Sequence, residues 1–184
     1  MWGVCKQENR ASITTVDTMR QSFGDVLVMF DLQPWSRAHE LVDAACVLLG
    51  TELETESVLA LASLTDRDAC NGFVMAERVT AARADLGMPA LDRDARLVRA
   101  AQVIARRWQE GGLTDHELAR WAHNTVTHWA HRLRTHEVAI LHDLVMHYGV
   151  LEELQYSALD GRSAHQRLVE IVATLLGLPD PWCR

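Results

Sequence analysis

Apolar residues recur along much of this chain at the spacing of amphipathic α-helices. Between Asp92 and Glu110 they fall on one face of a helix, because they are three, four or seven positions apart. That face consists of Leu97, Val98, Ala101, Ile104, Ala105 and Trp108. A similar stripe predicts a final helix from Ser163 to Leu176, and it consists of Leu168, Ile171, Val172, Leu175 and Leu176. We therefore expect an all-α, single-domain bundle of about six to eight helices.

Capping residues and helix breakers predict further helices upstream. Ser36 is the expected N-cap of a helix that Gly50 ends, and a short helix follows over residues 55–64. A longer helix is expected over residues 65–86, before the next Gly and Pro. Four of its apolar residues are expected to face the core: Phe73, Ala76, Val79 and Ala84.

The start of the next helix has a clear signal, but its end does not. Thr114 and Glu117 have the spacing of a capping box, which predicts a helix N-terminus there. Neither Gly nor Pro occurs from Leu113 to Tyr148. One helix of that length would be roughly 50 Å long, whereas a compact domain of this size is about 40 Å across. We expect a bend or break at residues 124–127, where β-branched residues cluster and Asn can adopt a left-handed conformation.

Residues 15–30 fit either a helix or a strand. Helical spacing relates Val16, Met19, Phe23, Leu27 and Phe30, whereas the apolar run 26–30 alone resembles a buried strand. A lone strand would find no partner strand elsewhere in the chain, so a helix is favoured. Residues 1–12 lack this periodicity and are expected to be poorly ordered. The predicted organisation is a loosely attached N-terminal segment, 1–34, followed by a helical bundle domain, 35–184.

Charge and cysteine placement narrow the class of protein. The 184 residues carry a net charge of −7, but residues 93–134 hold eight Arg and four acidic residues. The overall negative charge argues against a general nucleic-acid-binding surface. The four cysteines form no CxxC pair, and neither a leader sequence nor an apolar stretch of about 20 residues is recognisable. We expect a reduced, cytoplasmic protein that does not enter a membrane.

Histidines are concentrated in one part of the chain, with seven of the nine between positions 116 and 147. His128 and His131 are three residues apart, and Asp143 and His147 are four apart, so each pair could share a metal ion on a helix. The ExxH pairs of di-iron bundles and the HExxH motif are both absent. A metal-binding protein or metalloenzyme that uses these four residues is therefore an alternative, and no cofactor is expected in the favoured interpretation.

A solvated helix face is the favoured explanation of the histidine row. In helical projection, one side holds His116, Arg120, His123 and Thr127. The opposite side holds the apolar residues Leu118, Trp121 and Ala122.

A helix-turn-helix is a further alternative for residues 114–134. The segment has an Ala in its first half, apolar residues in its second half and arginines at its end, which would suit contact with DNA phosphates. The Gly usual at the turn is replaced by His123. This would make the chain a DNA-binding regulator.

A stretch of about forty residues, 113–150, resembles small all-helical proteins of actinobacteria-like genomes. The likeness rests on Leu113, Thr114 and Asp115, on residues 118–123, and on Val126 and His128. Those proteins are mostly uncharacterised, and some look like immunity or regulatory partner proteins. The resemblance implies a partner-binding role and transfers no catalytic residue.

The favoured function is a non-enzymatic helical interaction protein of the immunity or regulatory type. No nucleophile elbow, P-loop, GxGxxG motif or catalytic carboxylate pair occurs, which favours a binding protein over an enzyme. The expected partner is a protein, rather than nucleic acid or a membrane, and homo-oligomerisation stays open. The residues expected to contact it are Arg120, His123, His131 and Arg134.

Overall fold

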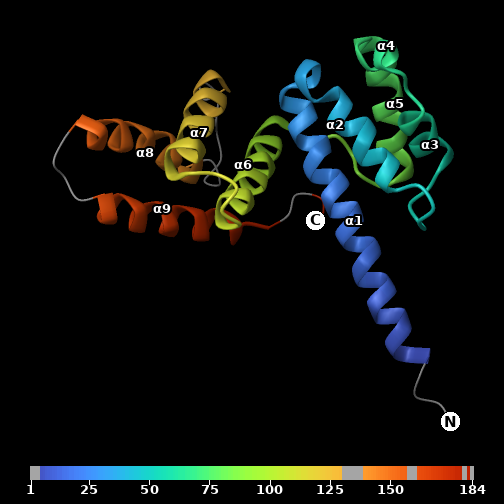
Figure 1. The fold of residues 1–184 in the computed structure, drawn as a ribbon, viewed down its shortest axis with the longest axis horizontal. Coiled ribbons are helices and arrows are strands. Elements are labelled where there is room, and N and C mark those ends of the chain that lie inside the picture. Colours follow the sequence, from blue (N-terminus) through green and yellow to red (C-terminus); the bar gives the residue numbers. More distant parts are fainter. Residues whose placement is uncertain (1–4, 130–138, 157–160, 180–181, 183–184) are drawn as a thin grey trace. The chain divides into compact units, whose positions relative to one another are not determined.

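The computed structural model describes residues 5–129, 139–156, 161–179 and 182. Every regular element in these residues is a helix, so the all-α prediction is confirmed (Figure 1). The helices fall into two compact units, residues 1–90 and residues 91–184. None of the helices within the described ranges is long and apolar enough to cross a bilayer.

Five helices form the N-terminal unit. They are α1 (Cys5–Leu32), α2 (Pro34–Val47), α3 (Glu56–Ala62), α4 (Asp66–Ala69) and α5 (Gly72–Asp85). The C-terminal half of α1 packs against α2, while its N-terminal half extends beyond the other helices of the unit (Figure 1). The boundary predicted at residue 34 lies between α1 and α2, which both belong to this unit. It falls inside a helical hairpin whose two helices pack against each other.

Residues 15–30 are helical, as favoured. Phe23, Leu27 and Phe30 are buried, as the helical spacing predicts. Val28 and Met29 are also buried, because this end of α1 is covered around most of its circumference. A helix buried on all sides has a continuous apolar run, so its sequence cannot be distinguished from a buried strand by periodicity alone.

The start of α2 differs from the prediction. Pro34, and not a residue after Ser36, is the first helical residue, and Gln33 is the N-cap. Pro suits this position because the first backbone N–H of a helix has no partner within the helix. The Ser36 hydroxyl instead donates to the Gln33 carbonyl oxygen at 3.3 Å.

The single helix predicted over residues 65–86 is two helices. Thr65 and Asp68 form a capping box for the four-residue α4, and Asn71 then caps α5. The new start shifts the buried face of α5 to Met75, Val79, Ala82 and Arg83. Val79 was predicted correctly, but Phe73, Ala76 and Ala84 are exposed, which contradicts their predicted place in the core.

Four helices form the C-terminal unit. They are α6 (Arg93–Gln109), α7 (Asp115–Trp129), α8 (Ala139–Tyr156) and α9 (Gly161–Leu176). The predicted stripes of α6 and α9 are buried, apart from Trp108 and Leu176, which are half-buried. The capping box is confirmed: Thr114 accepts a hydrogen bond from the backbone N–H of Glu117, and the Glu117 carboxylate accepts from Thr114.

The break predicted at residues 124–127 of the long Gly- and Pro-free stretch is wrong. Residues 124–127 are part of α7, which continues to Trp129. Helix α8 packs along α7 in the opposite direction, since His116 meets Glu152 while His123 meets Tyr148. The β-branched residues Thr125 and Val126 are buried against neighbouring elements, and this packing outweighs their weak helix propensity.

A buried glutamine ties α6 to the end of α9. The Gln102 side-chain amide donates to the carbonyl oxygens of Leu175 at 3.2 Å and Leu178 at 3.0 Å. The last carbonyls of a helix lack partners within the helix, so these bonds supply donors where α9 ends. Gln102 Oε1, in contrast, is buried without a hydrogen-bond partner among the described residues.

We expect Gln102→Met to lower the free energy of unfolding by about 1 kcal/mol, because the carbonyl oxygens of Leu175 and Leu178 each lose one hydrogen bond while one unsatisfied oxygen is removed. Urea denaturation followed by circular dichroism measures the difference. Gln109→Met, at an exposed position of the same helix, is the matched control and should change the free energy by less than about 0.5 kcal/mol. Equal stability of the two variants would contradict the assigned role.

Candidate functional site

Histidines and carboxylates meet between α7 and α8. His116 Nε2 lies 2.5 Å from Glu152 Oε1. The Tyr148 ring packs between two histidines, 5.4 Å from the His116 ring centroid and 4.7 Å from that of His123, with which it is stacked. The two histidines are thus partners of α8, although they were predicted to face solvent.

The Glu152 carboxylate is held in its charged form by this arrangement. Hydrogen bonds from His116 and then from Tyr148 lower the pKa of Glu152 below its ordinary value. Burial opposes this effect. The contact is therefore an interhelical link between two side chains that are each about one-third exposed.

A second carboxylate joins its own helix to two other helices of the unit. Asp115, in the first turn of α7, accepts a hydrogen bond from Trp108 Nε1 at 2.9 Å and one from His165 Nδ1 at 2.7 Å. The rings of Trp108 and His165 lie 5.8 Å apart. Asp115 thereby connects α6, α7 and α9 and gives the indole N–H of Trp108 the partner that a half-buried tryptophan needs.

His147 differs from these histidines because it is buried. Its side chain on α8 is only 4% exposed, and its Nε2 has no hydrogen-bond partner within the described residues. Burial lowers the pKa of His147, and the Asp115 carboxylate opposes this shift while Arg167 adds to it. The imidazole is consequently neutral in the folded protein near pH 7.

The residues predicted to contact a partner are described only in part. Arg120 is exposed on α7, and His123 is half-buried against Tyr148. His131 and Arg134 lie outside the described residues. Within the arginine-rich segment, Arg99 is only 2% exposed and lies over the Trp182 ring at 5.5 Å, so this arginine does not contribute to an exposed basic face.

The four predicted metal ligands are also described only in part. Asp143 is exposed and lies 3.7 Å from Arg167, while His147 is buried. The side chains of His128 and His131 lie outside what the structure describes. In the described part of the chain, no three His, Cys, Asp or Glu side chains are grouped so as to hold a metal ion. Metal binding by these residues stays a prediction.

The helix-turn-helix interpretation is wrong for residues 115–129. It needs a turn near His123, but α7 is continuous from Asp115 to Trp129. The stacking of His123 on Tyr148 holds that position against α8.

One aromatic side chain of the N-terminal unit is almost fully exposed to solvent. Phe73 is 92% exposed although it lies in the first turn of α5. The Asn71 side chain accepts hydrogen bonds from the backbone N–H groups of Phe73 at 3.1 Å and Val74 at 3.4 Å. The backbone that carries the exposed ring is therefore fixed by a helix cap.

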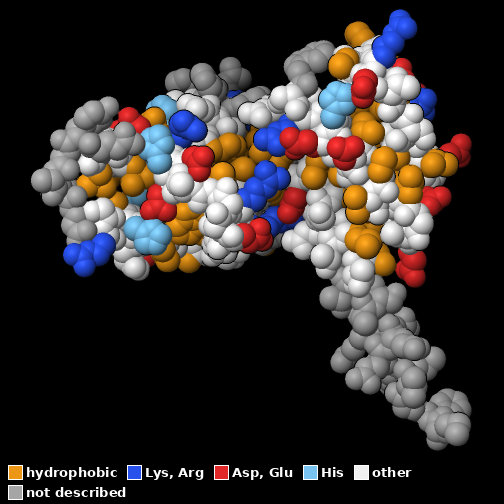
Figure 2. All heavy atoms as spheres, viewed as in Figure 1, with side chains coloured by type: hydrophobic (Ala, Val, Ile, Leu, Met, Phe, Trp, Pro, Cys, Tyr) orange, Lys and Arg blue, Asp and Glu red, His pale blue; other side chains and the backbone are white. Residues whose placement is uncertain are grey.

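Phe73 borders an open hollow of about 690 Å³, which we call the Phe73 surface. Its lining consists of Arg67, Cys70, Asn71, Gly72, Phe73 and Ala76. A smaller, mostly apolar pocket of about 310 Å³ adjoins it and shares Gly72 and Ala76. Figure 2 shows acidic and hydrophobic side chains intermixed on the visible face of this unit. The sequence signal for the site was Asn71, a strong N-cap residue inside the apparent long helix.

Comparisons with protein-family profiles, curated proteins and solved structures gave no match, so the site is interpreted from its own geometry.

The buried state of His147 predicts a pH-dependent stability. Its lowered pKa means that the folded chain binds fewer protons than the unfolded chain, so the free energy of unfolding rises with pH. We expect stability to fall as the pH drops below about 6.5, by at most about 1.4 kcal/mol per pH unit from this group. Urea denaturation at pH 5.5, 6.5 and 7.5 measures the slope.

His147→Phe should flatten this slope, because the titrating group is gone. The matched variant His142→Phe, at an exposed position of α8, should keep the wild-type slope. A slope in His147→Phe equal to that of the wild type would show that another group causes the pH dependence.

Proposed function

We propose that the chain is a non-enzymatic helical interaction protein that binds a protein partner through the Phe73 surface. The observation that carries this proposal is the 92% exposure of Phe73 on a capped helix beside an open hollow. Exposed single apolar residues are common on protein surfaces. An aromatic ring that is almost fully exposed, on a rigid backbone and beside a concave surface, has the features of an interface anchor.

Burial of the Phe73 ring by a partner would contribute enough binding free energy for an interface anchor. Full burial of a Phe side chain contributes about 1.5–3 kcal/mol. The Asn71 cap already fixes the backbone of Phe73, so little backbone entropy is lost when a partner covers the ring. Gly72, which has no side chain, and Ala76, whose side chain is a methyl group, line the same hollow, which leaves room for a partner to approach.

Other features support the same function. The resemblance of residues 113–150 implies a partner-binding role, and Arg120 stays an exposed candidate contact in the C-terminal unit. Cys46 and Cys70 are free thiols on exposed residues, which suits a reducing compartment. We therefore place the proposed interaction in the cytoplasm.

A photo-crosslinking residue at position 73 tests the proposal. We expect p-benzoylphenylalanine at this position of the full chain to crosslink one cellular protein reproducibly. The same residue at position 59, where Leu59 is 47% exposed on α3, should not crosslink that protein. Crosslinks that are the same at both positions, or none at position 73, would refute the proposal.

The crosslinked protein then allows a quantitative test with purified components. We expect Phe73→Ala to weaken its binding at least tenfold, about 1.4 kcal/mol, because the central aromatic contact is removed. Leu59→Ala is the matched control and should change the Kd by less than twofold. Isothermal titration calorimetry measures both values, and an unchanged Kd in Phe73→Ala would contradict the assigned anchor.

A further inference from the structure

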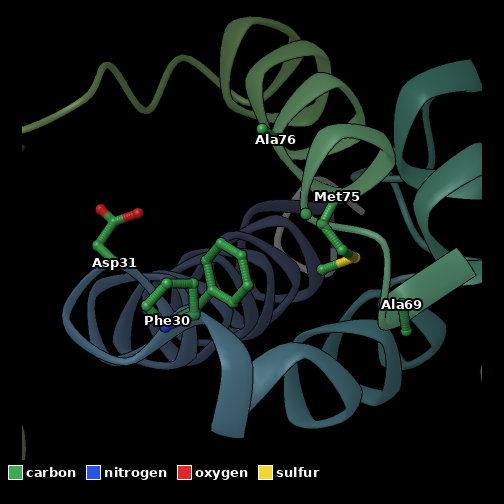
Figure 3. A pocket seen from close by; sticks show the side chains of 7 residues that line it. Phe30, Asp31, Ala69, Met75 and Ala76 are labelled. Atoms are coloured by element: carbon green, nitrogen blue, oxygen red, sulfur yellow. The ribbon is translucent and has the colours of Figure 1, made fainter.

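The mostly apolar pocket beside the Phe73 surface is formed by four helices of the N-terminal unit, and we call it the α1–α5 pocket. It has a volume of about 310 Å³, and the residues that line it include Phe30 and Asp31 of α1, Pro34 of α2, Ala69 of α4, and Met75 and Ala76 of α5. Figure 3 shows Phe30 and Asp31 on one wall and Ala76 on the facing helix α5. Apart from Asp31, these side chains are apolar.

The charge of Asp31 is compensated within the chain. Its carboxylate is paired with the guanidinium of Arg83, and the two side chains are only 13% and 10% exposed. Its second oxygen, Oδ2, is buried. The carboxylate therefore offers little to an incoming polar group, and an uncharged apolar group is the occupant that suits this pocket.

The ring of Phe73 has the size and the chemistry of such an occupant. A cavity of about 150 Å³ is already large enough to hold benzene, so the 310 Å³ of the pocket leaves room for a phenylalanine side chain. Phe73 is 92% exposed and is not part of the lining of the pocket in its own chain. One chain thus carries both an exposed ring and an apolar pocket that suits it.

The ring and the pocket lie next to each other on α5. The hollow that Phe73 borders shares Gly72 and Ala76 with the pocket. An interface with two-fold symmetry uses the same patch on both copies, so a protrusion on each copy has to meet a recess on the other. A ring beside a pocket on one surface satisfies this condition, because each ring then faces the pocket of the opposite copy.

The surroundings of the ring allow an identical copy to approach. Thr80 and Ala84, one helical turn apart further along α5, are exposed and small. The exposed charged residues nearest to Phe73 in sequence are of both signs, with Asp66 and Arg67 on α4 and Glu77 on α5. An acidic residue of one copy can therefore pair with the arginine of the other, which a surface of a single sign would not permit.

We propose that a second copy of this chain covers the Phe73 surface, with Phe73 of each copy inserted into the α1–α5 pocket of the other, against Phe30 and Met75. This inference rests on the proposed function, since it names the protein that covers the ring. The two-fold symmetry buries the ring twice, so every contact of Phe73 contributes twice to the stability of the dimer.

Self-association of the purified full chain is the first test. We expect sedimentation equilibrium to show a reversible monomer–dimer equilibrium. Phe73→Ala should raise its Kd about a hundredfold, because two rings are lost and each contributes about tenfold. Leu59→Ala, at a 47% exposed position of α3 outside the pocket, is the matched control and should change the Kd by less than twofold. A wild-type chain that stays monomeric at every concentration would overturn the proposal.

Blocking the pocket tests the other half of the contact. Ala76→Leu places a larger side chain in the pocket while Phe73 stays in place, and it should also raise the Kd of self-association at least tenfold. Ala81→Leu makes the same change at an exposed position of α5 outside the lining and should leave the Kd unchanged. Undiminished self-association of Ala76→Leu would overturn the insertion of Phe73 into this pocket.

Mixing the two weakened variants distinguishes insertion from a general loss of apolar surface. The Phe73→Ala chain keeps an open pocket, and the Ala76→Leu chain keeps its ring, so a mixed dimer retains one of the two contacts whereas each variant alone retains none. We expect the mixed pair to associate at least tenfold more tightly than either variant with itself, as measured by isothermal titration calorimetry. A mixed pair that is no tighter would overturn the proposal.

A crosslink within the dimer locates the ring directly. An equal mixture of ¹⁵N-labelled and unlabelled chains, both with p-benzoylphenylalanine at position 73, should give crosslinks between labelled and unlabelled copies. Mass spectrometry should place these crosslinks at Phe30, Pro34 or Met75 of the other copy, since these residues line the pocket. Crosslinks between copies at residues of the C-terminal unit would overturn the proposal.

The failure of this inference is distinguishable from the failure of the proposed function. A monomeric wild-type chain that crosslinks a different cellular protein at position 73 would overturn the second copy as the partner and leave the Phe73 surface as a binding site. A monomeric chain without any crosslink at position 73 would overturn both.

Discussion

Asn71 separates α4 from α5 and accepts hydrogen bonds from the backbone N–H groups of Phe73 and Val74. This cap fixes where α5 begins, and the start of a helix fixes which residues lie on each face. Met75 and Val79 thereby face the core of the N-terminal unit, and Phe73 faces solvent. The same register brings Arg83 to Asp31 and places Ala76 in both hollows. The Phe73 surface therefore depends on this helix cap.

The antiparallel packing of α7 and α8 has a comparable effect on the histidines. It brings Tyr148 between His116 and His123 and places Glu152 opposite His116. Asp115 adds a link to His165 on α9. Imidazoles that stack on aromatic rings or pair with carboxylates connect neighbouring helices, so these histidines contribute to helix packing. A local concentration of histidines therefore does not by itself indicate a metal site.

Much of the fold could be predicted because its signals are local. The stripe of α6, the Thr114 capping box and the final helix depend on spacings of three to eight residues, and the structure confirms them. The exposure of Phe73 could not be predicted from periodicity, because it depends on where α5 begins. The contacts of His116 with Glu152 and Tyr148 depend on the packing of α8, which lies far along the chain from His116. Packing between helices decides such positions and leaves no local pattern in the chain.

The burial of charged side chains changes how the charge distribution of the sequence is interpreted. The arginines of residues 93–134 suggest a basic face, but Arg99 is buried and lies over Trp182, so part of that positive charge is inside the protein. The acidic excess of residues 1–90 has no such cover at Asp66, whose side chain is fully exposed. Charge at the surface acts on approaching ligands, whereas buried charge mainly acts on its immediate neighbours. At Asp66, therefore, the surface that an approaching partner meets is negative.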